Sequence, residues 1–241
     1  MSEVLLIIPA YNEELNIRKV ITEVQHDLPF VDILVVNDCS TDKTLDVLKS
    51  SKGINYLSLP VNLGYAGALQ TGFKYAVEND YQIVIQFDGD GQHIAAEALK
   101  LIHVMEQENA DIVIGSRFKM KSSYNHSLFR KLGTGLFKNI IRKICKVDIT
   151  DPTSGFQVLK REIFEKYSKM NSYPEYPDAN LIIEMLLNNY KISEYQVDMR
   201  SREFGESMHS GIFKPMKYMV KMIYAILLIF MKGKRSVDFQ K

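Results

Sequence analysis

The chain has 241 residues, 46% of them hydrophobic and 24% charged, which fits one globular α/β domain with a sizeable core. Its two cysteines, Cys39 and Cys145, are too few for a disulfide framework, so a reducing compartment is expected. The apolar run at residues 4–10 is short and follows no basic segment, so no signal peptide is expected. The formal net charge of +1 points to no particular partner, and a nucleic-acid partner is not expected.

Strand and helix patterns alternate five times in the first half of the chain. Apolar runs predict strands at residues 4–8, 31–36, 54–59, 83–87 and 111–115. Helices are expected from 15 to near 29, at 43–50, from the loop at 62–68 to near 79, and at 95–107. Beyond residue 117 the pattern predicts helices at 127–146, 181–187 and 214–232, and strands at 156–159 and 192–199. Near-continuous apolar strands between helices indicate the α/β class, with a mostly parallel sheet covered on both faces.

The most informative stretch is residues 83–92, an apolar run that ends in Asp-Gly-Asp-Gly-Gln. Asp88 and Asp90 lie two residues apart, so their side chains are expected to point the same way as the chain leaves the sheet. Gln92 adds an amide oxygen, and an oxygen-only donor set suits Mg²⁺ or Mn²⁺ and suits zinc poorly. The alternative is a solvated acidic turn, but the position at the end of a buried strand favours a metal site.

Polar residues also follow the other predicted strands, at the edge of the sheet where ligands bind in parallel folds. They are Tyr11, Glu13, Asp38, Asp42 and Arg117. A divalent metal at this edge suits a substrate that carries phosphates, because Mg²⁺ bridges phosphate oxygens. No P-loop pattern is present, so the positive charge would come from arginines, of which Arg117, Arg130 and Arg202 are the best placed. A structural role is the alternative for each arginine.

The C-terminal residues form a second predicted unit, 212–241, after a catalytic domain at 1–211. Seven Lys or Arg occur there against one acidic residue, Asp238. Lysines recur on one side of the predicted helix and apolar residues on the other, and the ten apolar residues at 222–231 are too few to cross a bilayer. A basic amphipathic helix of this kind fits the plane of a membrane surface. A helix docked on the core with a lysine-rich outer face is the alternative.

Seven motifs, in this order along the chain, resemble family 2 glycosyltransferases. They are IPAYNEE at residues 8–14, VNDCSTDKT at 36–44, NLG at 62–64, DGDGQ at 88–92, GSR at 115–117, DPTSGF at 151–156 and REFGES at 202–207. The last two narrow the resemblance to the branch of dolichyl-phosphate mannose synthase and the bacterial polyprenyl-phosphate glycosyltransferases. One departure is visible, because Met208 and His209 follow Ser207 where this branch often has a lysine.

The resemblance implies a Rossmann-like GT-A fold and an inverting transfer of a sugar from a UDP- or GDP-linked donor. It implies that Pro9, Tyr11, Glu13 and Gly64 line the nucleotide and that Asp38 contacts its base or ribose. Asp88, Asp90 and Gln92 match the metal ligands, for Mg²⁺ or Mn²⁺. Arg117, Arg130 and Arg202, with Ser207, match positions that hold the diphosphate or the acceptor phosphate. Asp88, Asp90, Arg117 and Arg202 are the expected catalytic residues.

A polyprenyl phosphate fits as the acceptor, because a phosphate monoester is already an anion near neutral pH and attacks without a strong base. The alternative acceptor is a saccharide hydroxyl in cell-surface polysaccharide synthesis, for which Asp178 or Glu184 would be the candidate base. The lipid acceptor implies a peripheral or monotopic enzyme at the cytoplasmic face of the membrane. A small membrane protein or a second copy of the chain is a further candidate partner.

Three other classes are less well supported by the sequence. A phosphatase of the haloacid dehalogenase type also ends a strand in Asp-x-Asp, but it needs Thr or Val where Gln92 stands. An oxidoreductase is disfavoured because the loop at residues 62–67 lacks the third glycine of a dinucleotide fingerprint. A non-catalytic membrane adaptor with the same fold is disfavoured by the intact Asp88, Asp90 and Arg117.

Overall fold

A computed structural model of the 241-residue chain describes residues 3–119, 128–169, 174–201 and 213–238. Its strands are β1 (Val4–Ala10), β2 (Asp32–Asn37), β3 (Asn55–Ser58), β4 (Ile83–Gln86), β5 (Ile112–Ser116), β6 (Gln157–Lys160) and β7 (Ile192–Gln196). They form one sheet in the order β3-β2-β1-β4-β6-β5-β7. β6 runs antiparallel to β4 and β5, and the other neighbours are parallel. The predicted mostly parallel α/β sheet is confirmed.

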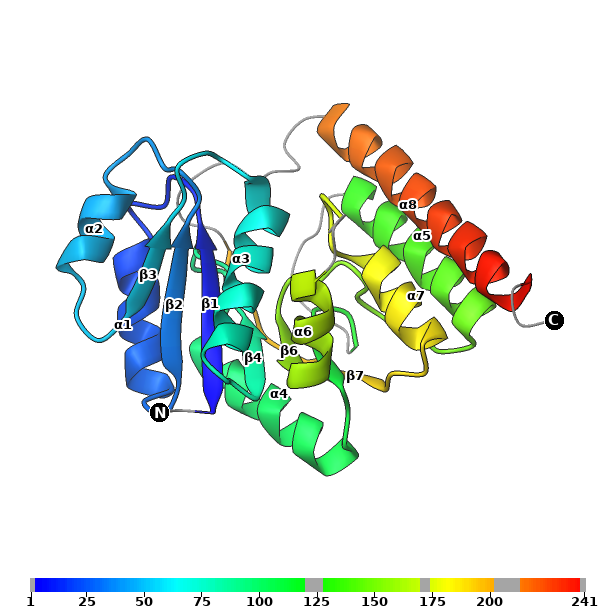
Figure 1. The fold of residues 1–241 in the computed structure, drawn as a ribbon, viewed down its shortest axis with the longest axis horizontal. Helices are drawn as coiled ribbons and strands as arrows, with labels where there is room; N and C mark the ends of the chain where they lie inside the picture. Colours follow the sequence, from blue (N-terminus) through cyan, green and yellow to red (C-terminus); the bar gives the residue numbers. More distant parts are fainter. Residues whose placement is uncertain (1–2, 120–127, 170–173, 202–212, 239–241) are drawn as a thin grey trace.

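The helices lie on both faces of this sheet (Figure 1). They are α1 (Ile17–Asp27), α2 (Thr44–Ser50), α3 (Gly64–Glu78), α4 (Ala95–Glu108), α5 (Leu128–Cys145), α6 (Arg161–Lys169), α7 (Ala179–Leu187) and α8 (Phe213–Asp238). β1 is buried along its whole length, because its alternate side chains enter two cores. Leu5 and Ile7 pack in the core with α3, and Leu6 and Ile8 pack in the core with α1 and α4. This double burial explains the uninterrupted apolar pattern of the strand.

Three helices run side by side at the end of the molecule away from α2 (Figure 1). The ring of Phe137 in α5 meets the ring of Tyr218 in α8 edge to face, with centroids 6.1 Å apart. Tyr218, Met222 and Ile226 of α8 belong to the same core as the residues of α5, α7 and the sheet. The predicted C-terminal helix is therefore present, and one of its faces docks on the core.

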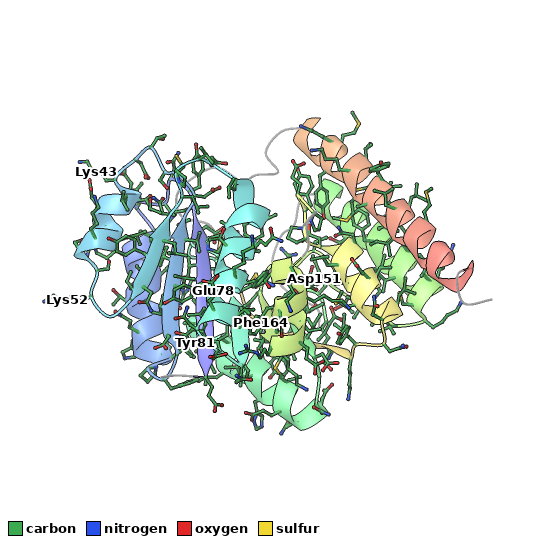
Figure 2. All side chains as sticks on the ribbon, viewed as in Figure 1. Lys43, Lys52, Glu78, Tyr81, Asp151 and Phe164 are labelled. Atoms are coloured by element: carbon green, nitrogen blue, oxygen red, sulfur yellow. The ribbon has the colours of Figure 1, made fainter. Side chains whose placement is uncertain are left out.

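Two features of the middle of the chain differ from the simple alternation of the sequence pattern. β6 inserts antiparallel between β4 and β5, so the last parallel pair of the sheet is β5 with β7. The pattern does not predict α6, a short helix that begins directly after β6. Its Ile163, Phe164 and Tyr167 are buried; Phe164 is labelled in Figure 2. Tyr167 packs against Phe73 of α3 with ring centroids 5.8 Å apart. Nine residues give a weak periodic signal, and packing against α3 stabilises this helix.

Candidate active site

The carboxyl ends of β1, β2 and β4 lie at one edge of the sheet, because these three neighbouring strands are parallel. The loops that follow β1 and β2 are joined by hydrogen bonds. The backbone N–H of Glu13 donates to the hydroxyl of Thr44 at 2.9 Å, and that of Glu14 donates to the Asp42 carboxylate at 3.1 Å. Burial raises the pKa of Asp42, but hydrogen bonds from the backbone and hydroxyl of Thr44 and from the backbone of Glu14 outweigh it, so the pKa is lowered. Tyr11 lies in the first of these loops, at this edge of the sheet, and its side chain is about half exposed.

Asp38 stands directly after β2 and holds the loop that begins α3. Its Oδ1 accepts a hydrogen bond from the backbone N–H of Leu63 at 2.7 Å, and the side-chain amide of Asn62 donates to its carbonyl at 3.1 Å. Gly64 follows with a φ of +77°, a conformation that favours glycine. Asp38 is almost fully buried. The predicted nucleotide residues Asp38 and Gly64 are therefore neighbours, and one carboxylate oxygen of Asp38 fixes the loop.

Asp88 and Asp90 follow β4 and reach the same edge. Oδ1 of Asp88 accepts a hydrogen bond from the hydroxyl of Tyr65 at 3.1 Å, and Oδ1 of Asp90 accepts one from the backbone N–H of Gln92 at 3.0 Å. The side-chain nitrogen of Gln92 donates to the carbonyl of Arg200 at 3.3 Å, which orients the amide. A Cβ atom on Gly89 would lie 3.2 Å from the carbonyl of Pro9, so the glycine allows this segment to pack closely on β1.

His93 contacts both the backbone and the carboxylate of Asp88. The sequence patterns do not predict this role. Its Nδ1 accepts a hydrogen bond from the backbone N–H of Asp88 at 3.0 Å, and its Nε2 lies 3.5 Å from Oδ2 of Asp88. Because Nδ1 is the acceptor, the ring proton sits on Nε2, where it faces the carboxylate. The imidazole is buried and stacks on Phe156, with centroids 4.6 Å apart. The only sequence signal for it is its place directly after Gln92.

Burial raises the pKa of Asp88, and the neighbouring Asp90 raises it further. His93, the hydroxyl of Tyr65 and Arg117 act in the opposite direction. Two carboxylates this close to each other disfavour their own ionisation, and a cation between them would remove that penalty. The electrostatics of the pair therefore suit a site for a positively charged ion.

Within the described residues, no group of three or more His, Cys, Asp or Glu side chains is arranged to hold a metal ion. The set after β4 thus offers two carboxylates, with the amide oxygen of Gln92 beside them. Mg²⁺ commonly takes one or two protein carboxylates and completes its shell with water and substrate phosphates. The residues present fit Mg²⁺ or Mn²⁺ bound together with a diphosphate.

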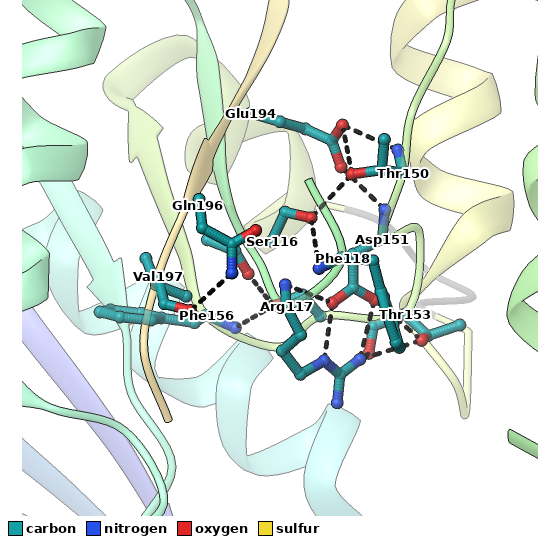
Figure 3. A network of polar contacts seen from close by, with 12 residues as sticks. Ser116, Arg117, Phe118, Thr150, Asp151, Thr153, Phe156, Glu194, Gln196 and Val197 are labelled. Carbon is teal, nitrogen blue, oxygen red and sulfur yellow. Dashed lines mark hydrogen bonds and ion pairs between the residues drawn. The ribbon is translucent and has the colours of Figure 1, made fainter. Parts of the chain in front are cut away.

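Arg117 lies directly after β5 and forms an ion pair with Asp151 (Figure 3). Its Nε donates to Oδ2 of Asp151 at 2.6 Å and its Nη2 to Oδ1 at 2.8 Å, a bidentate pair. Nη2 also donates to the carbonyl and hydroxyl oxygens of Thr153. Burial opposes the charge, but the bonds to Asp151 outweigh it, and the pKa of Arg117 is raised. Asp151 has no exposed surface, so this pair holds the guanidinium in one orientation.

Glu194 of β7 fixes the backbone that carries Asp151. Its two oxygens accept hydrogen bonds from the backbone N–H groups of Thr150 and Asp151, at 2.7 and 2.8 Å (Figure 3). The same loop then turns towards Asp88: a Cβ atom on Gly155 would lie 2.8 Å from the hydroxyl of Tyr65 and 3.5 Å from Oδ2 of Asp88. The 151–156 motif therefore connects Arg117 with the carboxylates after β4.

Asp178 closes the site on the side of the helices. It precedes α7, and its Oδ2 accepts a hydrogen bond from the hydroxyl of Tyr218 in α8 at 2.8 Å. Burial raises the pKa of Asp178 to about 6, with Asp151 and Asp88 raising it and Tyr218 and Arg117 lowering it. The charges of Arg117, Asp88 and Asp178 therefore act on one another. Glu184, the other candidate base, lies one turn and a half further along α7.

The structure gathers most of the predicted site residues at one edge of the sheet. Those brought together are Pro9, Tyr11, Glu13, Asp38, Gly64, Asp88, Asp90, Gln92 and Arg117. Arg130 lies in α5, and its side chain is outside the described part of the structure. Arg202 and Ser207 also lie outside the described residues.

The seven-stranded sheet, mostly parallel and flanked by helices, has a GT-A-like fold. The fold resembles that of glucosyl-3-phosphoglycerate synthase from Mycobacterium tuberculosis in complex with phosphoglyceric acid, with a TM-score of 0.70, 18% identity and coverage of 92% of this chain and 79% of that one. The same enzyme in complex with Mn²⁺, UDP and glucosyl-3-phosphoglycerate matches with a TM-score of 0.66, 19% identity and coverage of 94% and 79%. At this identity the likeness concerns the fold.

The chain belongs to glycosyl transferase family 2, whose profile matches residues 5–168. A polyprenol monophosphomannose synthase of Mycolicibacterium smegmatis is 29% identical, over 86% of this chain and 81% of that protein. A UDP-N-acetylglucosamine–dolichyl-phosphate N-acetylglucosaminyltransferase of Methanococcus voltae is 25% identical, over 90% of this chain and 94% of that protein. The resemblance predicted from the motifs is confirmed.

Proposed function

We propose that this protein transfers a sugar from a nucleotide diphosphate sugar to a polyprenyl phosphate, with inversion at the anomeric carbon. The observation that carries the proposal is the juxtaposition of Asp88 and Asp90 with Arg117, through the 151–156 loop. Carboxylates for a metal and an arginine for phosphate are the two charges that a diphosphate donor and a phosphate acceptor require. Relatives named for polyprenol and dolichyl phosphates support this acceptor class.

For the donor, we assign the nucleotide to the edge formed by Pro9, Tyr11, Glu13, Asp38 and Gly64. Asp88, Asp90 and Gln92 would hold Mg²⁺ or Mn²⁺, which supplies charge neutralisation for the departing nucleotide diphosphate. Asp90 is buried and anchored by the N–H of Gln92, and Asp88 is anchored by Tyr65 and His93. Both carboxylates are thus pre-positioned, so little ordering is needed when the donor arrives.

For the acceptor, we assign the phosphate to the side of Arg117. A phosphate oxygen forms the new bond to the anomeric carbon, and the bond to the diphosphate breaks, its electron pair leaving with the nucleotide. The pair with Asp151 uses the Nε and Nη2 edge of the planar guanidinium and fixes its direction, and we assign the phosphate to the Nη1 side. Arg130, Arg202 and Ser207 remain proposed partners of the phosphates from the sequence motifs. A dianionic acceptor needs no strong base.

A second candidate is transfer to a saccharide hydroxyl, and one observation favours it. Burial raises the pKa of Asp178 to about 6, and the charges of Arg117 and Asp88 act on it; such a value suits a general base near neutral pH. In the lipid-phosphate reaction the same carboxylate would have no proton to accept. The acceptor assay distinguishes the two.

The test is a transfer assay with Mg²⁺ or Mn²⁺, a panel of radiolabelled UDP- and GDP-sugars, and polyprenyl phosphate in detergent. Label that moves into the organic phase supports the lipid acceptor and identifies the donor. Nucleotide release only in the presence of a saccharide supports the second candidate instead. No metal-dependent turnover with any donor would overturn both and favour a non-catalytic adaptor.

A lipid acceptor places the enzyme at a membrane, which we propose to be its cytoplasmic face. None of the helices in the described part of the chain is long and apolar enough to cross a bilayer. On the ground of the lipid acceptor we propose peripheral association, and a small membrane protein or a second copy of the chain stays a candidate partner.

A further inference from the structure

Helix α8 has two apolar faces, and they do different things. One face carries Tyr218, Met222 and Ile226, which are buried in the core shared with α5 and α7. Tyr218 also packs against the ring of Tyr176, with centroids 4.9 Å apart. This inner face accounts for the docking of the helix. The sequence pattern divides the helix into one apolar and one basic side. It does not distinguish this inner apolar face from a second apolar face.

The second face, which we call the outer face of α8, is exposed. It consists of Met216, Val220, Ile223, Tyr224, Leu227, Leu228 and Met231. Val220 is 64% exposed and Leu227 56%, so the described protein covers little of these side chains. From Met216 to Met231 the stripe follows the helix axis for roughly 22 Å at 1.5 Å per residue. Contiguous exposed apolar surface of this extent marks an interaction site.

The charges around the outer face indicate its partner. α8 contains six Lys or Arg and one acidic residue, and the neighbouring α5 contains five Lys or Arg and no acidic residue. Lys217 is exposed, and the half-buried Lys221 pairs with Glu175. A second copy of α8 laid on this face would bring two basic helices together, which repel each other. Anionic lipid headgroups neutralise such a helix while the acyl chains take up its apolar stripe.

We propose that the outer face of α8 lies in the interface of an anionic lipid bilayer, with the helix axis in the membrane plane and the inner face still packed on α5 and α7. The hydrogen bond between Tyr218 and Asp178 places the N-terminal half of this helix next to the active site. Binding of α8 to the bilayer therefore holds the active site at the membrane surface, where the lipid acceptor of the proposed function resides. Membrane binding by α8 rests on the proposed function, but vesicle binding can be measured without donor or acceptor.

The test compares the whole protein with two double variants in vesicle sedimentation. Val220→Gln/Leu227→Gln changes the outer face, and Tyr56→Gln/Leu99→Gln changes two other exposed apolar residues, in β3 and α4. Vesicles contain either phosphatidylcholine alone or equal parts of phosphatidylcholine and phosphatidylglycerol. Thermal unfolding checks that both variants keep the wild-type fold, and size-exclusion chromatography gives the oligomeric state.

The wild-type protein and the Tyr56/Leu99 variant should bind the anionic vesicles, and the outer-face variant should bind roughly tenfold more weakly. Equal binding by all three proteins would overturn the proposal, and so would wild-type protein that binds neither vesicle. A wild-type dimer that the outer-face substitutions dissociate, without vesicle binding, would assign the face to a second copy. Transfer to a short, water-soluble isoprenyl phosphate is assayed in parallel. Transfer without vesicle binding overturns only the proposed membrane binding of α8. Vesicle binding without transfer overturns only the proposed reaction.

Discussion

The hydroxyl of Tyr218 donates a 2.8 Å hydrogen bond to the carboxylate of Asp178, and this bond joins α8 to the start of α7. Both groups are desolvated, and burial raises the pKa of each. The bond stabilises the ionised carboxylate, so it opposes the effect of burial on Asp178. A residue of the C-terminal helix thereby lowers the pKa of a carboxylate whose charge interacts with those of Arg117 and Asp88.

Asp178→Asn should change how stability depends on pH. The pKa of Asp178 is about 6 in the folded protein and 3.8 as its ordinary value, so the folded state binds the proton more tightly than the unfolded chain. The free energy of unfolding contributed by this group is therefore highest below about pH 4 and falls as pH rises through 6. Asn removes this loss, so the variant should gain on the order of 2 kcal/mol relative to wild type between pH 4 and 7.

Urea unfolding at several pH values measures this difference, and Asp46→Asn, which changes an exposed acid of α2, is the matched control for an Asp-to-Asn substitution. Tyr218→Phe removes the donor that stabilises the carboxylate, so its destabilisation of about 1 kcal/mol should be larger at pH 8 than at pH 4. A pH-independent difference for Asp178→Asn would show that the carboxylate has an ordinary pKa.

Asp90→Asn should abolish most metal-dependent transfer and leave the fold intact. The Asn oxygen still accepts the N–H of Gln92, so the turn is kept, while one of two carboxylates is lost. We expect transfer to fall by about two orders of magnitude or more, measured with Mg²⁺ and with Mn²⁺. Wild-type turnover in Mn²⁺ would be incompatible with the metal assignment.

His93→Phe should weaken metal binding, although His93 is not a proposed metal ligand and acts only by orienting Asp88. Phe keeps the packing against Phe87 and Phe156 but removes the acceptor of the Asp88 backbone N–H. Groups that orient a metal ligand typically contribute 10- to 100-fold to affinity, and we expect a loss in the range of about tenfold or more. Titration followed by the Mn²⁺ electron paramagnetic resonance signal measures it. Leu101→Phe, a change to Phe in the buried face of α4, controls for repacking; equal losses in both would assign the effect to packing.

Arg117 and Asp151 should be strongly coupled in stability. Arg117→Met leaves the carboxylate of Asp151, which has no exposed surface, buried without its bidentate partner, at a cost of about 3 kcal/mol or more. Asp151→Asn should destabilise the protein too, but the double variant should be more stable than the sum of the single effects predicts. A double-mutant cycle from urea unfolding gives the coupling. Additive effects would show that the pair contributes no stability.

The sequence by itself determined the parallel half of the fold and the donor side of the site. Uninterrupted apolar strands such as β1 indicate burial on both faces, and the alternation with helices then requires parallel neighbours. Residues at the ends of such strands share one edge, so the pattern alone places Asp38 together with the pair Asp88 and Asp90. This information is local: it needs only strand direction and period.

Only the tertiary structure decided the relations between segments far apart in the chain. The antiparallel insertion of β6 brings the 151–156 loop to Asp88, and nothing in the spacing of residues encodes that pairing. Asp151 grips Arg117 across 34 positions, and Tyr218 reaches Asp178 across 40. Both faces of α8 are apolar in sequence, and packing against α5 and α7 determines which one is buried. Period and polarity are properties of single elements, whereas these contacts depend on how the elements pack.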